Sequence, residues 1–162
     1  MVRRTNESKV QAVRAMARLA RTLERSSGDL NLAHYRVLSA VADGDERASR
    51  VAERLALGKP TVSAAVESLC KRGLLAREVS GDDRRVATLS PTPAGEAALA
   101  EVEELMVGRI DEILRRTEDP DAVVEALGQV GVALDEIAAD RAAHRATKRG
   151  KDSAGATEGR TR

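Results

Sequence analysis

Two short helices and a β-hairpin follow one another between Ala48 and Ser90, and this order constrains the fold more than any other feature of the chain. The first helix, ASRVAERLAL, carries apolar side chains at helical spacing on one face and charged side chains on the other. Gly58 permits a sharp turn, and Pro60 is tolerated only in the first turn of a helix, where its missing N–H would have no partner. A second helix, TVSAAVESLCKR, is therefore predicted to follow the turn directly.

The second helix has one apolar face and one face suited to close contact with a partner. Val62, Val66 and Leu69 repeat at i, i+4 and i+7, so they are predicted to face the core. The residues on or near the opposite face are small or carry a donor or acceptor, so they can approach base edges in a DNA major groove. They are Lys59, Thr61, Ser63, Ala64 and Ser68. A solvated helix face is the alternative interpretation.

A hairpin with a charged tip at 80–85 follows the second helix. Gly81 and the aspartates after it favour a turn, whereas Arg84 and Arg85 contribute little to folding and can insert into a narrow minor groove. Two helices and then a hairpin is the order of a winged helix-turn-helix, which predicts DNA binding. We add Arg47 and Ser49, at the start of the first helix, to the predicted contacts. A solubilising loop tip is the alternative for the two arginines.

Four short motifs lie in and just after this unit: Lys59-Pro-Thr-Val-Ser, Leu69 with Arg72-Gly-Leu-Leu, Asp83-Arg-Arg, and Thr92-Pro-Ala-Gly. With these motifs the chain resembles the MarR family of bacterial winged-helix regulators, over roughly residues 7–143. One departure is Pro91, where the family usually has an aliphatic residue. Because proline cannot donate to a strand ladder, we expect the second strand of the wing to end by Ser90.

The predicted fold is mainly α with a small β-hairpin wing (α+β), in which a winged helix-turn-helix lobe is joined to a helical dimerisation lobe. A length of 162 residues indicates one domain. The DNA-binding lobe is expected at about 32–91, and the dimerisation helices at about 7–25 and 92–143. Both ends are polar and lack periodicity, which predicts a flexible N-terminus at 1–6 and a disordered basic tail at 144–162.

Aromatic residues are nearly absent, with one Tyr and no Phe or Trp, so the core must be built from aliphatic residues and many alanines. Alanine buries little area, and the helices that follow the DNA-binding unit carry more apolar surface than one subunit can bury. We therefore predict a homodimer, with an intramolecular helix pair in a monomer as the alternative. The predicted interface residues, which include a seam close to that of a coiled coil, are Val10, Val13, Val123, Leu127, Val130, Leu134 and Ile137.

Charge is distributed unevenly although the net charge is only +1. Residues 47–85 carry 9 Lys and Arg against 5 Asp and Glu, whereas residues 86–143 carry 4 against 13. The predicted DNA-binding unit is therefore basic and the C-terminal helices are acidic. This polarity suits a protein that places one end on phosphates and keeps the other end away from them.

The resemblance also implies a small-molecule effector, because MarR proteins often bind small aromatic acids or phenols between their first, second and fifth helices. The matching positions are Met16, Leu19, Arg21, His34, Tyr35 and Met106. Arg21 or His34 could receive a carboxylate group. The alternative for His34 and Tyr35 is a packed helix whose polar ends are satisfied within the protein.

Other classes of protein have little support in the sequence. It contains no phosphate-binding loop, nucleophile–base pair or metal-ligand cluster, so we expect neither an enzyme nor a cofactor. Cys70 alone cannot form an internal disulfide, and a small, partly buried side chain is a simpler role for it than redox sensing. The sequence shows no signal peptide and no membrane-spanning run, which predicts a cytoplasmic, nucleoid-associated protein.

These features predict a sequence-specific transcriptional regulator that binds double-stranded DNA. We expect a repressor that acts as a homodimer on an inverted-repeat operator, because two recognition helices related by a two-fold axis read two half-sites. The alternative is a nucleoid-type binder of low sequence specificity, or a winged-helix module used for protein contacts.

Overall fold

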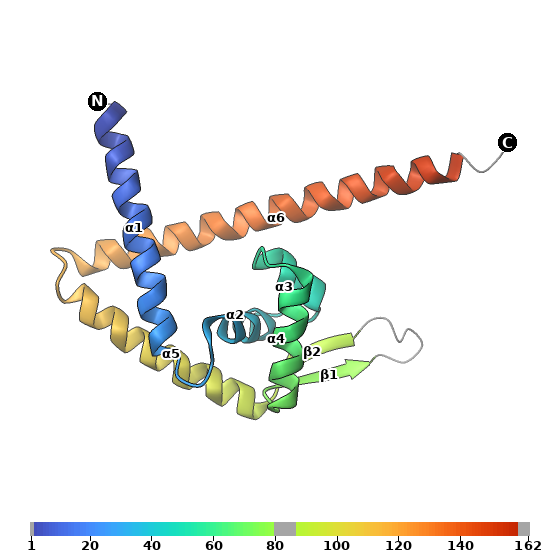
Figure 1. Ribbon diagram of the computed structural model, residues 1–162, viewed down its shortest axis with the longest axis horizontal. Coiled ribbons are helices and arrows are strands. Elements are labelled where there is room, and N and C mark those ends of the chain that lie inside the picture. Colours follow the sequence, from blue (N-terminus) through green and yellow to red (C-terminus); the bar gives the residue numbers. More distant parts are fainter. Residues whose placement is uncertain (1, 80–86, 159–162) are drawn as a thin grey trace.

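The computed structural model describes residues 2–79 and 87–158, which form helices and one small sheet. Their order confirms the predicted mainly helical winged-helix class (Figure 1). The elements are α1 (Val2–Ser26), α2 (Leu32–Ala42), α3 (Ala48–Arg54), α4 (Lys59–Lys71), β1 (Leu75–Val79), β2 (Ala87–Pro91), α5 (Pro93–Leu114) and α6 (Pro120–Glu158).

The core of the molecule lies in the lobe built from α2, α3, α4 and the hairpin. Val62, Val66 and Leu69 of α4 are at most 1% exposed, as their spacing predicts. They pack with fully buried side chains of α2 and α3, while Leu75 and Leu89 of the two strands close the core from the side of the sheet. Because this face of α4 is buried, its opposite face is turned to the solvent.

The hairpin pairs β1 with β2 in antiparallel register, from Leu75 opposite Pro91 to Val79 opposite Ala87. The predicted end at Ser90 is therefore wrong by one residue, because β2 includes Pro91. The backbone N–H of Thr92 donates to the carbonyl of Leu74 at 3.1 Å. In an antiparallel ladder the next pair, Leu75 and Pro91, then exchanges no hydrogen bonds, so the missing N–H of proline costs the ladder nothing.

The two ends of the chain are more helical than the sequence predicts. Helix α1 begins at Val2, within the segment predicted to be flexible, and α6 continues to Glu158, through most of the tail predicted to be disordered from 144. Both segments lack an apolar stripe, but alanine, lysine and arginine are good helix formers. Such residues extend a helix that is already nucleated at small cost.

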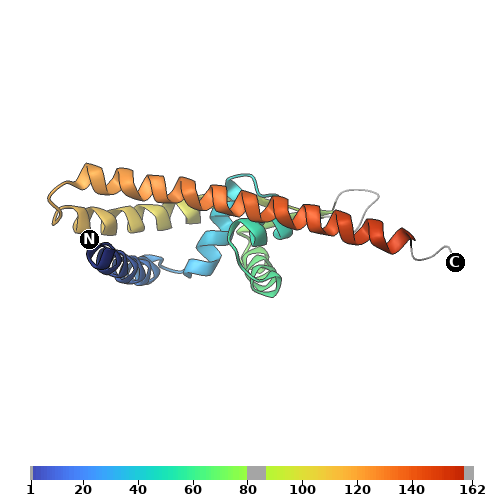
Figure 2. The ribbon, with the colours of Figure 1, turned by 90° about the horizontal axis from the view of Figure 1, so that it is seen from above.

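A helical lobe lies beside the core lobe (Figure 2). In it α1 packs against α5, and α6 runs back along the molecule and passes over α3. No helix among the described residues is long and apolar enough to cross a membrane.

The Thr92-Pro-Ala-Gly motif joins the two lobes. The hydroxyl of Thr92 accepts a hydrogen bond from the N–H of Gly95 at 3.0 Å, which caps α5, and donates to the carbonyl of Gly73 at 2.6 Å. Gly95 is buried, and a Cβ added to it would overlap the carbonyl oxygen of Leu74. The start of α5 is thus locked to the chain between α4 and β1, and the glycine is needed for this close approach.

Replacing Gly95 with Ala should therefore destabilise the protein by about 2 kcal/mol or more, because backbone atoms must move to accept the methyl group. The matched control is Gly108→Ala on the same helix, where an added Cβ meets nothing within 4 Å. That variant should gain about 0.5–1 kcal/mol from better helix propensity. Urea unfolding of both variants checks this, and equal midpoints would contradict the packing argument.

Candidate nucleic-acid interface

Helix α4 lies beside the hairpin (Figure 1), and its solvent-exposed side is mostly polar. Its N-cap is Gly58, and a proline occupies its first turn, as the sequence predicts. Four of the five predicted contact residues of this helix are exposed, and the fifth is half-buried. The exposed residues are Lys59, Thr61, Ser63 and Ala64, and the half-buried residue is Ser68. The helix therefore offers a surface of short side chains around one lysine, which is compatible with close approach to base edges.

The start of α3 lies on the same lobe. Arg47 is the N-cap residue of α3, its side chain forms no capping hydrogen bond, and both Arg47 and Ser49 are exposed. Arg84 and Arg85, the predicted wing contacts, lie outside the described residues.

Sequence reasoning overlooked Arg77, which is exposed on β1. The pKa of Glu67 on α4 is lowered mainly by a hydrogen bond from Lys71 and by the charge of Lys71. The positive charge of Arg77 lowers this pKa further, by a smaller amount. Arg77 therefore adds a cation between α4 and the hairpin. The segment LAREV carried no signal for this exposure, because Arg77 follows the buried Leu75 by two residues and pairs with the buried Leu89, so strand periodicity places it on the buried face of the sheet.

Apolar side chains predicted for a dimer interface are largely uncovered in the single chain. Val13 and Leu134 are each 61% exposed, and Val123 alone of the seven predicted residues is half-buried. The others, at 38–46% exposure, are Val10, Leu127, Val130 and Ile137. Apolar stripes of this extent on two helices are typical of surfaces that bind another protein.

The residues predicted to bind an effector come from three helices. Met106 of α5 is 7% exposed, Leu19 of α1 and His34 and Tyr35 of α2 are half-buried, and Met16 and Arg21 of α1 are exposed. Three hollows on the described part of the chain, of about 730, 450 and 540 Å³, are lined by other residues. The effector site at these six residues therefore stays a prediction.

Tyr35 and His34 have polar neighbours within the chain. Burial, followed by the carboxylate of Glu103 on α5, raises the pKa of the Tyr35 hydroxyl. Partial burial and then the positive charge of Arg72 lower the pKa of His34. Arg72 itself donates to the backbone carbonyl of Asp29 at 3.2 Å, so it ties the end of α4 to the loop before α2.

His34 should therefore titrate below the ordinary histidine value of 6.5, since the folded state disfavours its charged form. Because the unfolded chain binds the proton more tightly, this residue makes the protein less stable as the pH falls through the two pKa values. NMR titration of the ring protons checks the direction of this shift, with His144→Gln to assign the His34 signals. A His34 pKa above 6.5 would contradict the described environment.

Cys70 is half-buried in α4, as predicted. Among the described residues no group of three His, Cys, Asp or Glu side chains could hold a metal ion.

A lobe with this helix order and hairpin, joined to a lobe of long helices, defines a winged helix-turn-helix protein. Residues 28–86 match the model of the MarR family. The predicted resemblance is thus confirmed over residues 28–86, the winged-helix part of the chain. A comparison with curated proteins gave no match.

Solved structures share the fold over most of the chain. The transcriptional repressor CouR bound to a 23-mer DNA duplex is 25% identical, with 76% of this chain and 89% of that chain covered and a TM-score of 0.65. CouR from Rhodococcus jostii RHA1 bound to p-coumaroyl-CoA is 21% identical, covering 83% and 93%, with a TM-score of 0.64. A MarR family regulator from Silicibacter pomeroyi is 24% identical, covering 80% and 89%, with a TM-score of 0.62.

Proposed function

We propose that this protein is a sequence-specific transcriptional repressor that binds an inverted-repeat operator as a homodimer. The observation that carries the proposal is the exposed face of α4, whose short polar side chains stand beside the hairpin while its apolar face is buried. An α-helix fits the DNA major groove, and a hairpin next to it can reach the adjacent minor groove. The basic charge of residues 47–85 supports contact with phosphates.

The uncovered stripes on α1 and α6 support the dimer. Two copies of the DNA-binding lobe related by a two-fold axis would present two α4 helices to two half-sites. We also propose that a small aromatic effector, bound near Tyr35 and Met106, releases the DNA. The similarity to CouR, which was solved with p-coumaroyl-CoA, supports an effector that carries a phenolic group.

Low-specificity binding is the competing function, and the specificity ratio distinguishes the two. Fluorescence anisotropy compares the intergenic DNA upstream of the protein's own gene with a scrambled duplex of equal length, at several salt concentrations. A preference of roughly a thousandfold or more supports a specific regulator. Equal binding to both duplexes contradicts a sequence-specific regulator if no other genomic fragment displaces the bound duplex more strongly than scrambled DNA does.

Removing the two wing arginines, Arg84→Ala with Arg85→Ala, should weaken DNA binding roughly tenfold or more. The slope of the logarithm of the binding constant against the logarithm of the salt concentration should become shallower by about one for each phosphate that an arginine no longer neutralises. The matched control is another pair of consecutive, exposed arginines, Arg115 and Arg116, which follow the C-terminal end of α5. Changing that pair to alanine should leave both quantities near their original values. Unchanged binding in the wing variant would remove the wing from the mechanism.

Placing charge in the apolar seam, with Leu127→Glu and Leu134→Glu, should convert the dimer to a monomer because two carboxylates per chain cannot be buried without partners. Val132→Glu is the control, since Val132 is also 61% exposed but lies about 160° around α6 from Val130. Sedimentation velocity gives the masses. A monomeric unaltered protein, or a monomeric control, would contradict the assigned interface.

A further inference from the structure

Helix α6 touches the DNA-binding lobe of its own chain. Both views show it passing over α3 after it leaves the helical lobe (Figures 1 and 2). Small side chains of α6 line the groove at this crossing, and two of them, Ala138 and Ala142, are half-buried. Alanines let two helices approach closely, but they provide little to hold them in one position.

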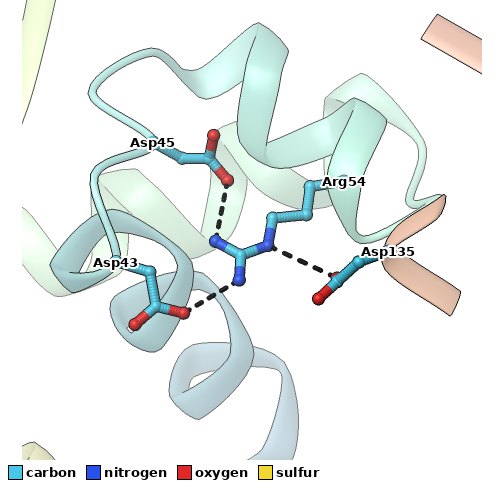
Figure 3. A network of polar contacts seen from close by, with 4 residues as sticks. All are labelled: Asp43, Asp45, Arg54 and Asp135. Atoms are coloured by element: carbon cyan, nitrogen blue, oxygen red, sulfur yellow. Dashed lines mark hydrogen bonds and ion pairs between the residues drawn. The ribbon is translucent and has the colours of Figure 1, made fainter. Parts of the chain in front are cut away.

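A charged cluster at the same crossing links α6 to α3 (Figure 3). The guanidinium group of Arg54, at the end of α3, meets three carboxylates. Its Nη2 lies 2.9 Å from Asp43, its Nη1 lies 3.4 Å from Asp45, and its Nε lies 4.0 Å from Asp135 on α6. The first two partners belong to the loop between α2 and α3, so they orient the guanidinium and turn its Nε toward α6.

The charges make Arg54 the central member of this cluster. Three carboxylates face one cation, and without it Asp135 would face two like charges across the crossing. Burial disfavours the cation, but the carboxylates of Asp43 and Asp45 outweigh this effect and raise the pKa of Arg54. The side chain therefore stays charged and is one of the groups that join α6 to the lobe.

The same turns of α6 serve the helical lobe. With about 100° between successive residues, Asp135 lies roughly 100° around the helix from Leu134 and about 140° from Val130 in the apolar stripe. One segment of α6 thus carries both the predicted partner-facing stripe and the contact with its own DNA-binding lobe. Any movement of α6 at this crossing would change the angle between the lobe and the dimer axis.

We propose that Arg54 is a positioning residue for DNA reading: by holding Asp135 it fixes the angle between the DNA-binding lobe and α6, and with it the half-site spacing that the dimer accepts. This inference rests on the proposed function. Arg54 itself is turned toward the carboxylates of this cluster, so its role is indirect.

The test uses Asp135→Asn in the full-length protein, because this change removes the contact with α6 and keeps the two pairs within the lobe. Glu136→Gln is the matched control, since this exposed neighbour lies on another side of α6. Asp135→Glu should preserve the contact. Arg54→Gln removes all three pairs and should show the largest effect.

The first readout needs no DNA. Spin labels at Lys71→Cys and Glu125→Cys, in a Cys70→Ser background diluted with unlabelled chains, report the distance between the lobe and α6. The distribution should be narrow in the parent and in Glu136→Gln, and broad in Asp135→Asn and Arg54→Gln. An equally narrow distribution in Asp135→Asn would overturn the proposal even if the protein proves to bind DNA specifically.

The second readout is binding to duplexes whose half-site spacing differs by single base pairs. Asp135→Asn should reduce the preference for the best spacing by up to about fivefold, the range of a partly exposed ion pair. An unchanged preference would overturn the link to DNA reading. Failure of the parent protein to prefer any duplex would contradict the proposed function instead, while the spin-label distances still decide whether Arg54 holds α6.

Discussion

The burial of one face of α4 is the constraint on which the rest of the structure depends. Val62, Val66 and Leu69 are sealed between α2, α3 and the hairpin, and each such side chain contributes about 1.5–3 kcal/mol when fully buried. Because the helix cannot rotate without exposing them, Lys59 and the short side chains near it must face outward. The proposed reading surface is thus a consequence of core packing in the same helix.

The two lobes are joined at two places of different character. At the start of α5 the chain passes directly from one lobe to the other, and the join is tight because Thr92 caps the helix and Gly95 lies against the backbone of Leu74. At the crossing of α6 and α3 the join is electrostatic and partly exposed, with Arg54 35% exposed and Asp135 70% exposed. A rigid connection and an adjustable one together would allow a lobe to be held at a set angle and still move when the proposed effector binds.

The sequence predicts the local elements well, because their causes are local. The spacing of Val62, Val66 and Leu69 and the cap at Thr92 define α4 and the start of α5 without knowledge of the rest. The ion pair between Arg54 and Asp135 could not be foreseen, since the partners are far apart in the sequence and only the packing of α6 on α3 brings them together. Whether Pro91 could belong to the strand depended on which ladder pairs exchange hydrogen bonds. The sequence alone does not reveal which pairs these are.

Selection of bound duplexes from a random pool tests the central claim most directly, because it assumes neither an operator nor a target gene. If two α4 helices read DNA as a symmetric pair, the enriched sequences should be inverted repeats with half-site centres about one helical turn, roughly 10 base pairs, apart. The same selection with the Leu127→Glu and Leu134→Glu variant should lose the repeat. A pool that shows no enriched sequence, or only a single unrepeated site, would contradict the account.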